Sequence, residues 1–152
     1  MNTLEISAEL AEEIREQGAA HYPDECCGAL LGRESAANNS VGLKRQILGL
    51  VPLVNRRDDS PRDRFSITAE DVLSAEKMAR LQGLEVLGWY HSHPDHEARP
   101  SEYDREHAWP WYSYVIVSVN AGVAAEMTCW RLRDDRAQFS PEGIKIGQRA
   151  AA

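Results

Sequence analysis

Residues 87–104 of this chain read Leu-Gly-Trp-Tyr-His-Ser-His-Pro-Asp-His-Glu-Ala-Arg-Pro-Ser-Glu-Tyr-Asp. The apolar and aromatic residues up to Tyr90 predict a buried β-strand that enters a polar loop. His91 and His93 follow two positions apart at the end of this strand. Residues two apart on a strand point to the same face, about 6.5–7 Å apart along the backbone. Two imidazoles so placed can share one metal ion if the strand end bends, and Pro94 then ends the strand because it has no N–H for a ladder hydrogen bond.

Ser101 and Asp104 continue the pattern as Ser-x-x-Asp, which predicts a helix N-terminus with Ser101 as the N-cap. A capped helix start holds the Asp104 carboxylate in a fixed direction, so we predict Asp104 as a third ligand beside His91 and His93. Three protein ligands with a fourth position left to water are typical of a catalytic zinc site, whereas a structural site usually takes four ligands. Two histidines and one aspartate in a tetrahedral site favour zinc over iron or manganese.

The spacing His-x-His, seven residues, Ser, two residues, Asp resembles the signature of the JAMM (MPN-plus) metalloproteases. The segment 23–32, Pro-Asp-Glu-Cys-Cys-Gly-Ala-Leu-Leu-Gly, resembles a second family segment, Pro-x-Glu-x-Cys-Gly-x-Leu-x-Gly. The resemblance covers the chain from about residue 3 to about residue 132. It implies the MPN/JAMM fold, which is cytidine-deaminase-like. The predicted order of elements agrees with that fold: α/β, with a mixed, mostly antiparallel sheet flanked by helices.

The resemblance also implies a role for each residue of the site. His91, His93 and Asp104 would bind one Zn²⁺ ion, Glu25 would act as general base, and Ser101 would donate a hydrogen bond to the oxyanion. From residue chemistry alone, Glu25 at the start of an apolar strand is better explained as an exposed strand end, and the resemblance reverses that preference. The activity implied is that of a zinc metalloprotease, a hydrolase of peptide or isopeptide bonds.

The chain is compact and resembles the small stand-alone bacterial members of the family. That resemblance implies cleavage after the Gly-Gly end of a ubiquitin-like, β-grasp sulfur-carrier protein, with release of a cysteine or a short extension. A deubiquitinase-like isopeptidase is the alternative among enzymes. A non-catalytic MPN module that binds a partner and keeps its metal for stability is the alternative from another class. Every functional position of the family is filled here, which disfavours the inactive scaffold.

Composition narrows the classes of partner and the cellular location. The net charge of −7, from 17 basic and 24 acidic residues, argues against nucleic acid as a partner. No apolar run approaches the roughly 18–20 residues of a membrane span, and the N-terminus has no signal-peptide pattern. The three cysteines show no framework spacing and no Cys-x-x-Cys, which favours reduced thiols. We therefore expect a cytoplasmic protein without membrane or nucleic-acid partners, and the oligomeric state, a homodimer included, is left open.

Length and patterning predict one domain over residues 1–146 and a disordered tail over 147–152. The predicted helices span 7–21, 68–82 and 101–108. The predicted strands span 3–6, 25–33, 41–54, 65–67, 86–93, 112–119, 123–132 and 139–146, the last as an edge strand. Residues 34–40 are expected to form a polar turn. Residues 55–64 are expected to form a solvated surface loop, or alternatively a flap that holds a peptide tail.

Overall fold

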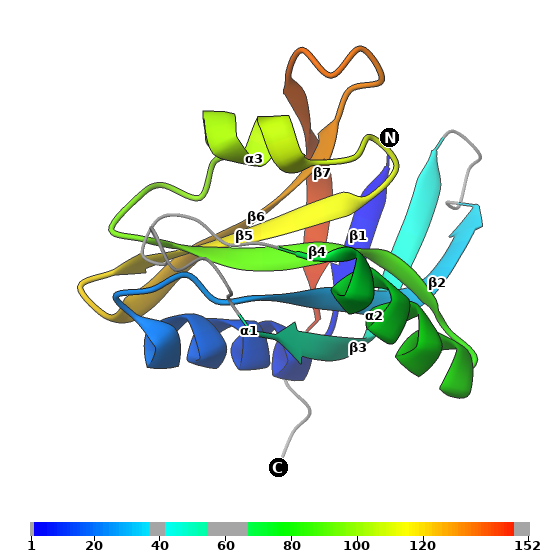
Figure 1. Ribbon diagram of the computed structural model, residues 1–152, viewed down its shortest axis with the longest axis horizontal. Helices are drawn as coiled ribbons and strands as arrows, with labels where there is room; N and C mark the ends of the chain where they lie inside the picture. The colour runs from blue at the N-terminus through cyan, green and yellow to red at the C-terminus, as the bar shows by residue number, and fades with distance from the viewer. Residues whose placement is uncertain (1, 37–41, 55–66, 148–152) are drawn as a thin grey trace.

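The computed structural model describes residues 2–36, 42–54 and 67–147, and Figure 1 shows the arrangement of their helices and strands. In chain order these elements are β1 (Thr3–Ile6), α1 (Ala8–His21), β2 (Cys27–Ala36), β3 (Leu43–Leu53), α2 (Ala69–Leu81), β4 (Glu85–Pro94), α3 (Glu102–His107), β5 (Ser113–Asn120), β6 (Val123–Leu132) and β7 (Phe139–Ile146).

The strands form one sheet in the order β1-β3-β2-β4-β5-β6-β7, which curves until β7 meets β1 and closes a barrel. The pairs β2–β3, β2–β4, β5–β6 and β6–β7 are antiparallel, while β4–β5 and both pairings of β1 are parallel. This confirms the predicted class, a mixed and mostly antiparallel sheet with flanking helices.

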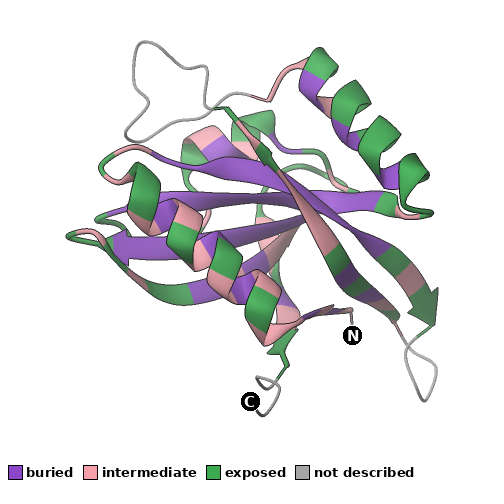
Figure 2. Cartoon of the chain, turned by 90° about the horizontal axis from the view of Figure 1, so that it is seen from below, coloured by how far each residue is buried: buried purple, intermediate pink, exposed green. Residues whose placement is uncertain are grey.

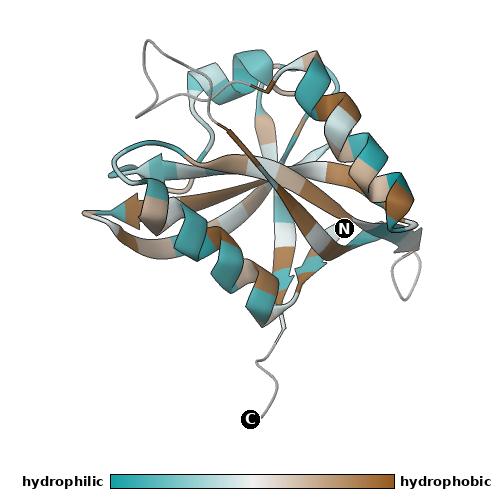
Figure 3. Cartoon of the chain, turned by 60° about the horizontal axis from the view of Figure 1, so that its bottom comes forward, coloured by the Kyte–Doolittle hydropathy of each residue, from teal (hydrophilic) through white to brown (hydrophobic). Residues whose placement is uncertain are grey.

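Two hydrophobic cores lie on opposite faces of the central strands. Alternate residues of a strand point to opposite faces, and β2 shows the consequence. Leu30 packs into the core that contains Ile14 of α1, whereas Ala29 packs into the core that contains Ala75 of α2. Figure 2 shows the buried strands between the two helices, and Figure 3 shows hydrophilic residues over much of the outer side of α1. The helices thus cover the two faces, and the strand ends remain available for a site.

Side-chain caps define where the two longer helices begin. Ser7 Oγ accepts a hydrogen bond from the Leu10 backbone N–H at 3.1 Å, so α1 begins at Ala8. Thr68 and Asp71 form a reciprocal capping box at the start of α2, as the sequence pattern predicts.

The prediction that residues 139–146 form an edge strand is wrong. The second edge of β7 pairs in parallel with β1, for example Ile144 with Leu4, and the Gly143 N–H donates to Asn2 O at 3.2 Å. The short N-terminal strand lies between β3 and β7, so the backbone groups of both neighbours are bonded and the sheet has no open edge there.

The prediction that a polar turn begins at residue 34 is wrong, because β2 continues to Ala36, and residues 37–40 lie outside the described residues. Glu34 lies within the strand, where its carboxylate accepts a hydrogen bond from Arg45 Nε of β3 at 2.6 Å. Arg45 is fully buried, so this ion pair compensates a charge removed from water.

Several predictions fall on residues that the structure does not describe. These are the loop or flap at 55–64, the first two residues of the strand predicted at 65–67, and the tail from residue 148 onward. Among the described helices, none combines the length and the apolar character that a membrane span requires.

Close approach between β4 and β5 requires glycine at position 88. A Cβ atom there would lie 1.9 Å from Ser113 O. We predict that Gly88→Ala lowers the free energy of unfolding by about 2–3 kcal/mol, because the two backbones must separate. In Gly49→Ala the new methyl group meets a flexible side chain at 3.4 Å, so stability should change by less than about 1 kcal/mol. Urea unfolding of both variants checks this, and equal losses would contradict it.

Candidate metal centre

The two histidines lie on the last residues of β4, where the strand is held on both sides. The strand pairs with β2 up to His91 and in parallel with β5 up to Pro94. Both imidazoles are buried, with 1% of His91 and 6% of His93 exposed. The predicted strand end at Pro94 is confirmed. The histidines are therefore fixed by the main sheet and not by a loop.

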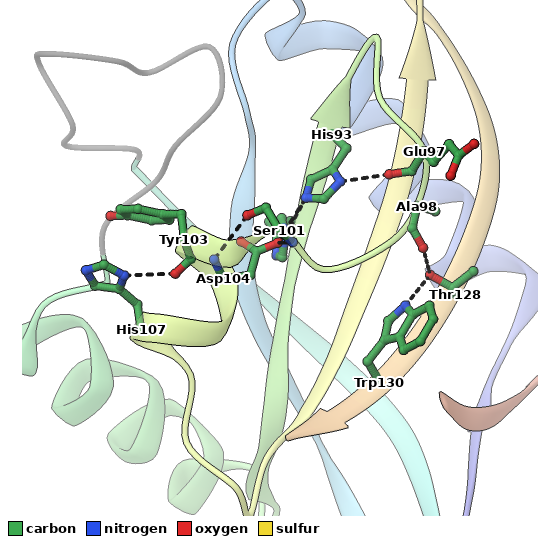
Figure 4. A network of polar contacts seen from close by, with 10 residues as sticks. His93, Glu97, Ala98, Ser101, Tyr103, Asp104, His107, Thr128 and Trp130 are labelled. Carbon is green, nitrogen blue, oxygen red and sulfur yellow. Dashed lines mark hydrogen bonds and ion pairs between the residues drawn. The ribbon is translucent and has the colours of Figure 1, made fainter. Parts of the chain in front are cut away.

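Asp104 reaches the same place from the short helix α3. Ser101 is its N-cap, and the predicted reciprocal box is present: Ser101 Oγ accepts from the Asp104 N–H at 3.1 Å, and Asp104 Oδ2 accepts from the Ser101 N–H at 2.8 Å. This cap turns the carboxylate back toward the start of the helix and toward β4, as Figure 4 shows.

The three predicted ligand atoms form a nearly equilateral triangle. His91 Nε2 lies 3.1 Å from His93 Nε2, and Asp104 Oδ2 lies 3.3 Å from His91 Nε2 and 3.1 Å from His93 Nε2. Zinc bonds of about 2.0–2.2 Å in a tetrahedron give edges of about 3.3 Å between ligand atoms. The triangle therefore has the size of one face of a zinc coordination tetrahedron, and the donor set fits this metal.

The environment also favours the protonation states that a metal requires. Burial lowers the pKa of His91, which favours the neutral ring. Burial alone would raise the pKa of Asp104, but the adjacent imidazoles of His91 and His93 hold it well below its usual range. Neutral imidazoles and an ionised carboxylate are the forms that coordinate metal ions.

A backbone carbonyl fixes the orientation of the second histidine. His93 Nδ1 lies 2.8 Å from Glu97 O, which accepts its proton in the tautomer that leaves Nε2 free. Hydrogen bonds of this kind orient the histidine ligands of metal ions. The sequence showed no sign of it, because the acceptor belongs to the backbone.

The loop between β4 and α3 is tied to the sheet through its neighbouring carbonyls. Ser118 Oγ donates to His96 O at 2.7 Å, and Thr128 Oγ1 donates to Ala98 O at 2.6 Å. Trp130 Nε1 donates in turn to Thr128 Oγ1 at 2.8 Å (Figure 4). These bonds restrict the loop that sets the distance from the histidines to α3.

Glu25 lies beside the triangle, in the segment between α1 and β2. Its side chain is buried, and only 3% of the residue is exposed. Glu25, His91 and His93 offer ligand atoms that all lie within 4.8 Å of one another. Glu25 lies two residues before Cys27, the first residue of β2, so it is not on the strand that was predicted to begin at residue 25. The structure thus brings together Glu25, His91, His93 and Asp104, with Ser101 at the adjoining helix end.

Two hollows open on the site, and Tyr103 lines both. One has a volume of about 330 Å³ and is lined by Ile67, His91, Tyr103, Asp104, Glu106, His107, Ala108, Trp109, Tyr114 and Arg136. The other has a volume of about 570 Å³ and is lined by Glu25, His93, His96, Glu97, Arg99, Ser101, Glu102 and Tyr103. Each hollow includes one of the two histidines. The aromatic lining from α3 to β5 was not predicted, although Trp109 and Tyr114 stand out in the sequence.

Two further histidines and the buried thiols take no part in the triangle. His96 and His107 are exposed, and the His107 ring stacks on Tyr103 with ring centroids 4.0 Å apart. Cys26 and Cys129 are buried and unpaired, and burial raises the pKa of the Cys26 thiol to about 11. Such thiols are poor nucleophiles at neutral pH.

The chain is similar to known proteins over most of its length. Residues 7–133 match the family described as prokaryotic homologs of the JAB domain (Prok-JAB). The chain belongs to this family. The desampylase of Haloferax volcanii is 32% identical over 127 residues, which are 80% of this chain and 85% of that protein. The human Lys-63-specific deubiquitinase BRCC36 is 40% identical over 58 residues, which are 34% of this chain and 18% of that protein.

A solved structure agrees over nearly the whole chain. The solution structure of a protein from Salinibacter ruber has a TM-score of 0.69 and 38% sequence identity, and the match covers 97% of this chain and 94% of that one. The predicted resemblance to the JAMM (MPN) proteins is thereby confirmed, together with the fold.

Metal content tests the triangle directly. We predict about one zinc ion per chain in the wild type, lost in His93→Ala because a site with three protein ligands does not retain zinc with two. His96→Ala removes an exposed histidine a few residues away and should keep the metal. Elemental analysis after dialysis measures all three proteins. A folded wild type that takes up no zinc when supplied with it would contradict the site.

Proposed function

We propose that this chain is a zinc-dependent hydrolase that cleaves a peptide or isopeptide bond at the C-terminal end of a ubiquitin-like protein. The main observation behind this proposal is the buried triangle of His91, His93 and Asp104 with Glu25 beside it. The similarity to a protein named desampylase and to a deubiquitinase supports the same class of substrate.

The five residues divide into ligands and groups that handle protons and charge. His91, His93 and Asp104 would hold the zinc ion, which when bound supplies a Lewis acid that makes water nucleophilic near neutral pH. Glu25 accepts a proton from the attacking water at a carboxylate oxygen and then transfers it to the leaving amine. Its place within 4.8 Å of both imidazoles suits this shuttle.

Ser101 combines capping with stabilisation of the transition state. Its Oγ uses one lone pair to accept from the Asp104 N–H at 3.1 Å. A hydroxyl retains its single proton in that arrangement, so Ser101 can still donate to the oxyanion of the tetrahedral intermediate. Capping and donation are therefore compatible, and the residue is exposed toward the larger hollow.

The two hollows suit an extended tail that passes the triangle from one side to the other. Glycines beside the scissile bond let a backbone approach buried ligands closely, because they carry no Cβ. We therefore propose the Gly-Gly end of a ubiquitin-like sulfur-carrier protein as the substrate. The match to BRCC36 favours a deubiquitinase-like isopeptidase as the second candidate.

The form of the substrate separates the two candidates. A carrier protein with a linear C-terminal extension tests the first, and the same protein joined to a lysine side chain tests the second. We further propose a cytoplasmic location, since the three cysteines show no framework spacing, and a single functional domain over residues 1–146.

Replacing the base tests catalysis apart from metal binding. Glu25→Gln should lower kcat by about 10²- to 10⁴-fold, because the amide cannot accept the proton, while the zinc content stays unchanged. Glu97→Gln neutralises an exposed carboxylate that lines the same hollow and should keep kcat. If Glu25→Gln keeps full turnover, the proposed mechanism is wrong. If the wild type binds a ubiquitin-like partner without cleaving it, the non-catalytic module is correct.

A pair of matched caps separates the two roles of Ser101. Ser101→Ala should cost about 1 kcal/mol of stability through the lost cap and about 10²–10³-fold in kcat through the lost oxyanion donor. Thr68→Ala removes an equivalent capping hydrogen bond, also 3.1 Å long, from α2. It should cost similar stability and leave kcat unchanged. Thermal unfolding and steady-state kinetics of both variants check this, and a proportional loss of activity in Thr68→Ala would assign the effect to capping alone.

A further inference from the structure

Glu25 lies on a connecting segment and not on a helix or strand, so its position depends on what holds that segment. α1 ends at His21, Tyr22 is its C-cap, and β2 begins at Cys27. Along the chain, the regular structure nearest to Glu25 thus lies at the two ends of this short link. A base on such a segment needs anchors if it is to stay near the imidazoles.

The first anchor lies on the β2 side of Glu25. The Cys26 N–H donates to Ser92 Oγ at 2.8 Å, and the Ser92 N–H donates to Cys26 O at 3.1 Å. Ser92 is fully buried and lies between the two histidines on β4. The residue after the base is therefore bonded to the residue between the ligands.

The second anchor lies on the α1 side. Tyr22 Oη donates to Asp95 Oδ2 at 2.6 Å, and the Ala121 N–H donates to the other carboxylate oxygen, Oδ1, at 2.8 Å. The Asp95 N–H itself donates to Val119 O at 2.7 Å. One carboxylate thus joins the end of α1, the end of β4 and the β5–β6 turn.

The backbone at this junction is held in an unusual conformation. Asp95 has φ 58° and Ala121 has φ 49°, both in the left-handed region that residues other than glycine seldom adopt. Such conformations persist only where the surroundings determine them. A Cβ atom on the adjacent Gly122 would lie 3.8 Å from the Tyr22 ring. The hydrogen bond between Tyr22 and Asp95 therefore joins the segment that carries Glu25 to a junction whose backbone conformation is also held by other hydrogen bonds.

We propose that Tyr22 and Asp95 are positioning residues for the base: their hydrogen bond, with the bond between Cys26 and Ser92, holds Glu25 over the metal-ligand triangle. The two anchors flank Glu25 in the chain, and their partners Ser92 and Asp95 lie on either side of His93 in the chain. A shift of one relative to the other moves the carboxylate relative to the imidazoles. This inference rests on the proposed role of Glu25 as base.

The expected consequence is kinetic more than energetic. The hydrogen bond lies at the surface, where the net contribution of such a bond to stability is small. A displacement of about 1 Å at a reacting group, by contrast, can cost about 10²-fold in rate. Loss of the Tyr22 hydroxyl should therefore affect turnover far more than unfolding.

The test compares two tyrosines that donate equally short hydrogen bonds. Tyr22→Phe removes the bond to Asp95, and Tyr90→Phe removes a bond of 2.6 Å to Gln17 of α1 that does not involve the Glu25 segment. We expect Tyr22→Phe to keep its zinc and its KM, and to lose about 10- to 100-fold in kcat. We expect Tyr90→Phe to keep kcat, whatever its stability.

Hydrogen–deuterium exchange supplies a readout that does not depend on activity. Peptides spanning residues 22–27 should exchange about tenfold faster in Tyr22→Phe than in the wild type, and at the wild-type rate in Tyr90→Phe. Unchanged exchange in Tyr22→Phe overturns the inference even if the protein hydrolyses nothing. An inactive, zinc-loaded wild type with faster exchange in Tyr22→Phe overturns the proposed function and leaves the anchor in place.

A double-mutant cycle tests whether the two residues act as one device. Asp95→Ala should lower kcat at least as much as Tyr22→Phe, because it also releases Ala121. Adding Tyr22→Phe to Asp95→Ala should then change kcat less than twofold, since the shared bond is already absent. Additive losses in kcat, or equal losses in Tyr22→Phe and Tyr90→Phe, would show that Tyr22 contributes only to general stability.

Discussion

The contact between two buried imidazoles and one buried carboxylate is the interaction on which the rest of this structure depends. Removing such groups from water is costly unless each has a partner. Here the three atoms that would face a cation lie 3.1–3.3 Å from one another. An arrangement this close, with acceptors facing each other, is favourable when one cation lies among them. The fold supplies the rigidity that keeps it in place.

That rigidity comes from three directions. The parallel pairing of β4 with β5 continues to Pro94 and fixes both histidines. The reciprocal cap of α3 aims Asp104, and hydrogen bonds to consecutive loop carbonyls set the distance between strand and helix. Closure of the barrel by β1 adds a constraint from the far side, because the N-terminal strand bonds both β3 and β7. The base is held less directly, on a segment anchored at its two ends.

The local chemistry of the site was predictable from the sequence because it depends on short spacings. The His-x-His pair follows from strand periodicity, and the direction of Asp104 follows from the Ser-x-x-Asp cap. The role of Glu25 was not accessible in this way: residue chemistry alone favoured an exposed strand end, and only the family resemblance placed it near the histidines. In the structure it is buried. The prediction that β7 is an edge strand was wrong, because the pairing between β1 and β7 produces no local pattern in the sequence. The carbonyl of Glu97 and the carboxylate of Asp95 act through contacts that the sequence does not encode locally.

We propose that His91, His93 and Asp104 bind one zinc ion while Glu25 stays outside its coordination shell. Anomalous diffraction from zinc-loaded crystals, recorded on both sides of the zinc absorption edge, tests it most directly. We predict one strong peak about 2.0–2.2 Å from His91 Nε2, His93 Nε2 and Asp104 Oδ2, with the Glu25 carboxylate beyond bonding distance. A peak bonded to Glu25 in place of Asp104, or no peak between the histidines, would contradict it.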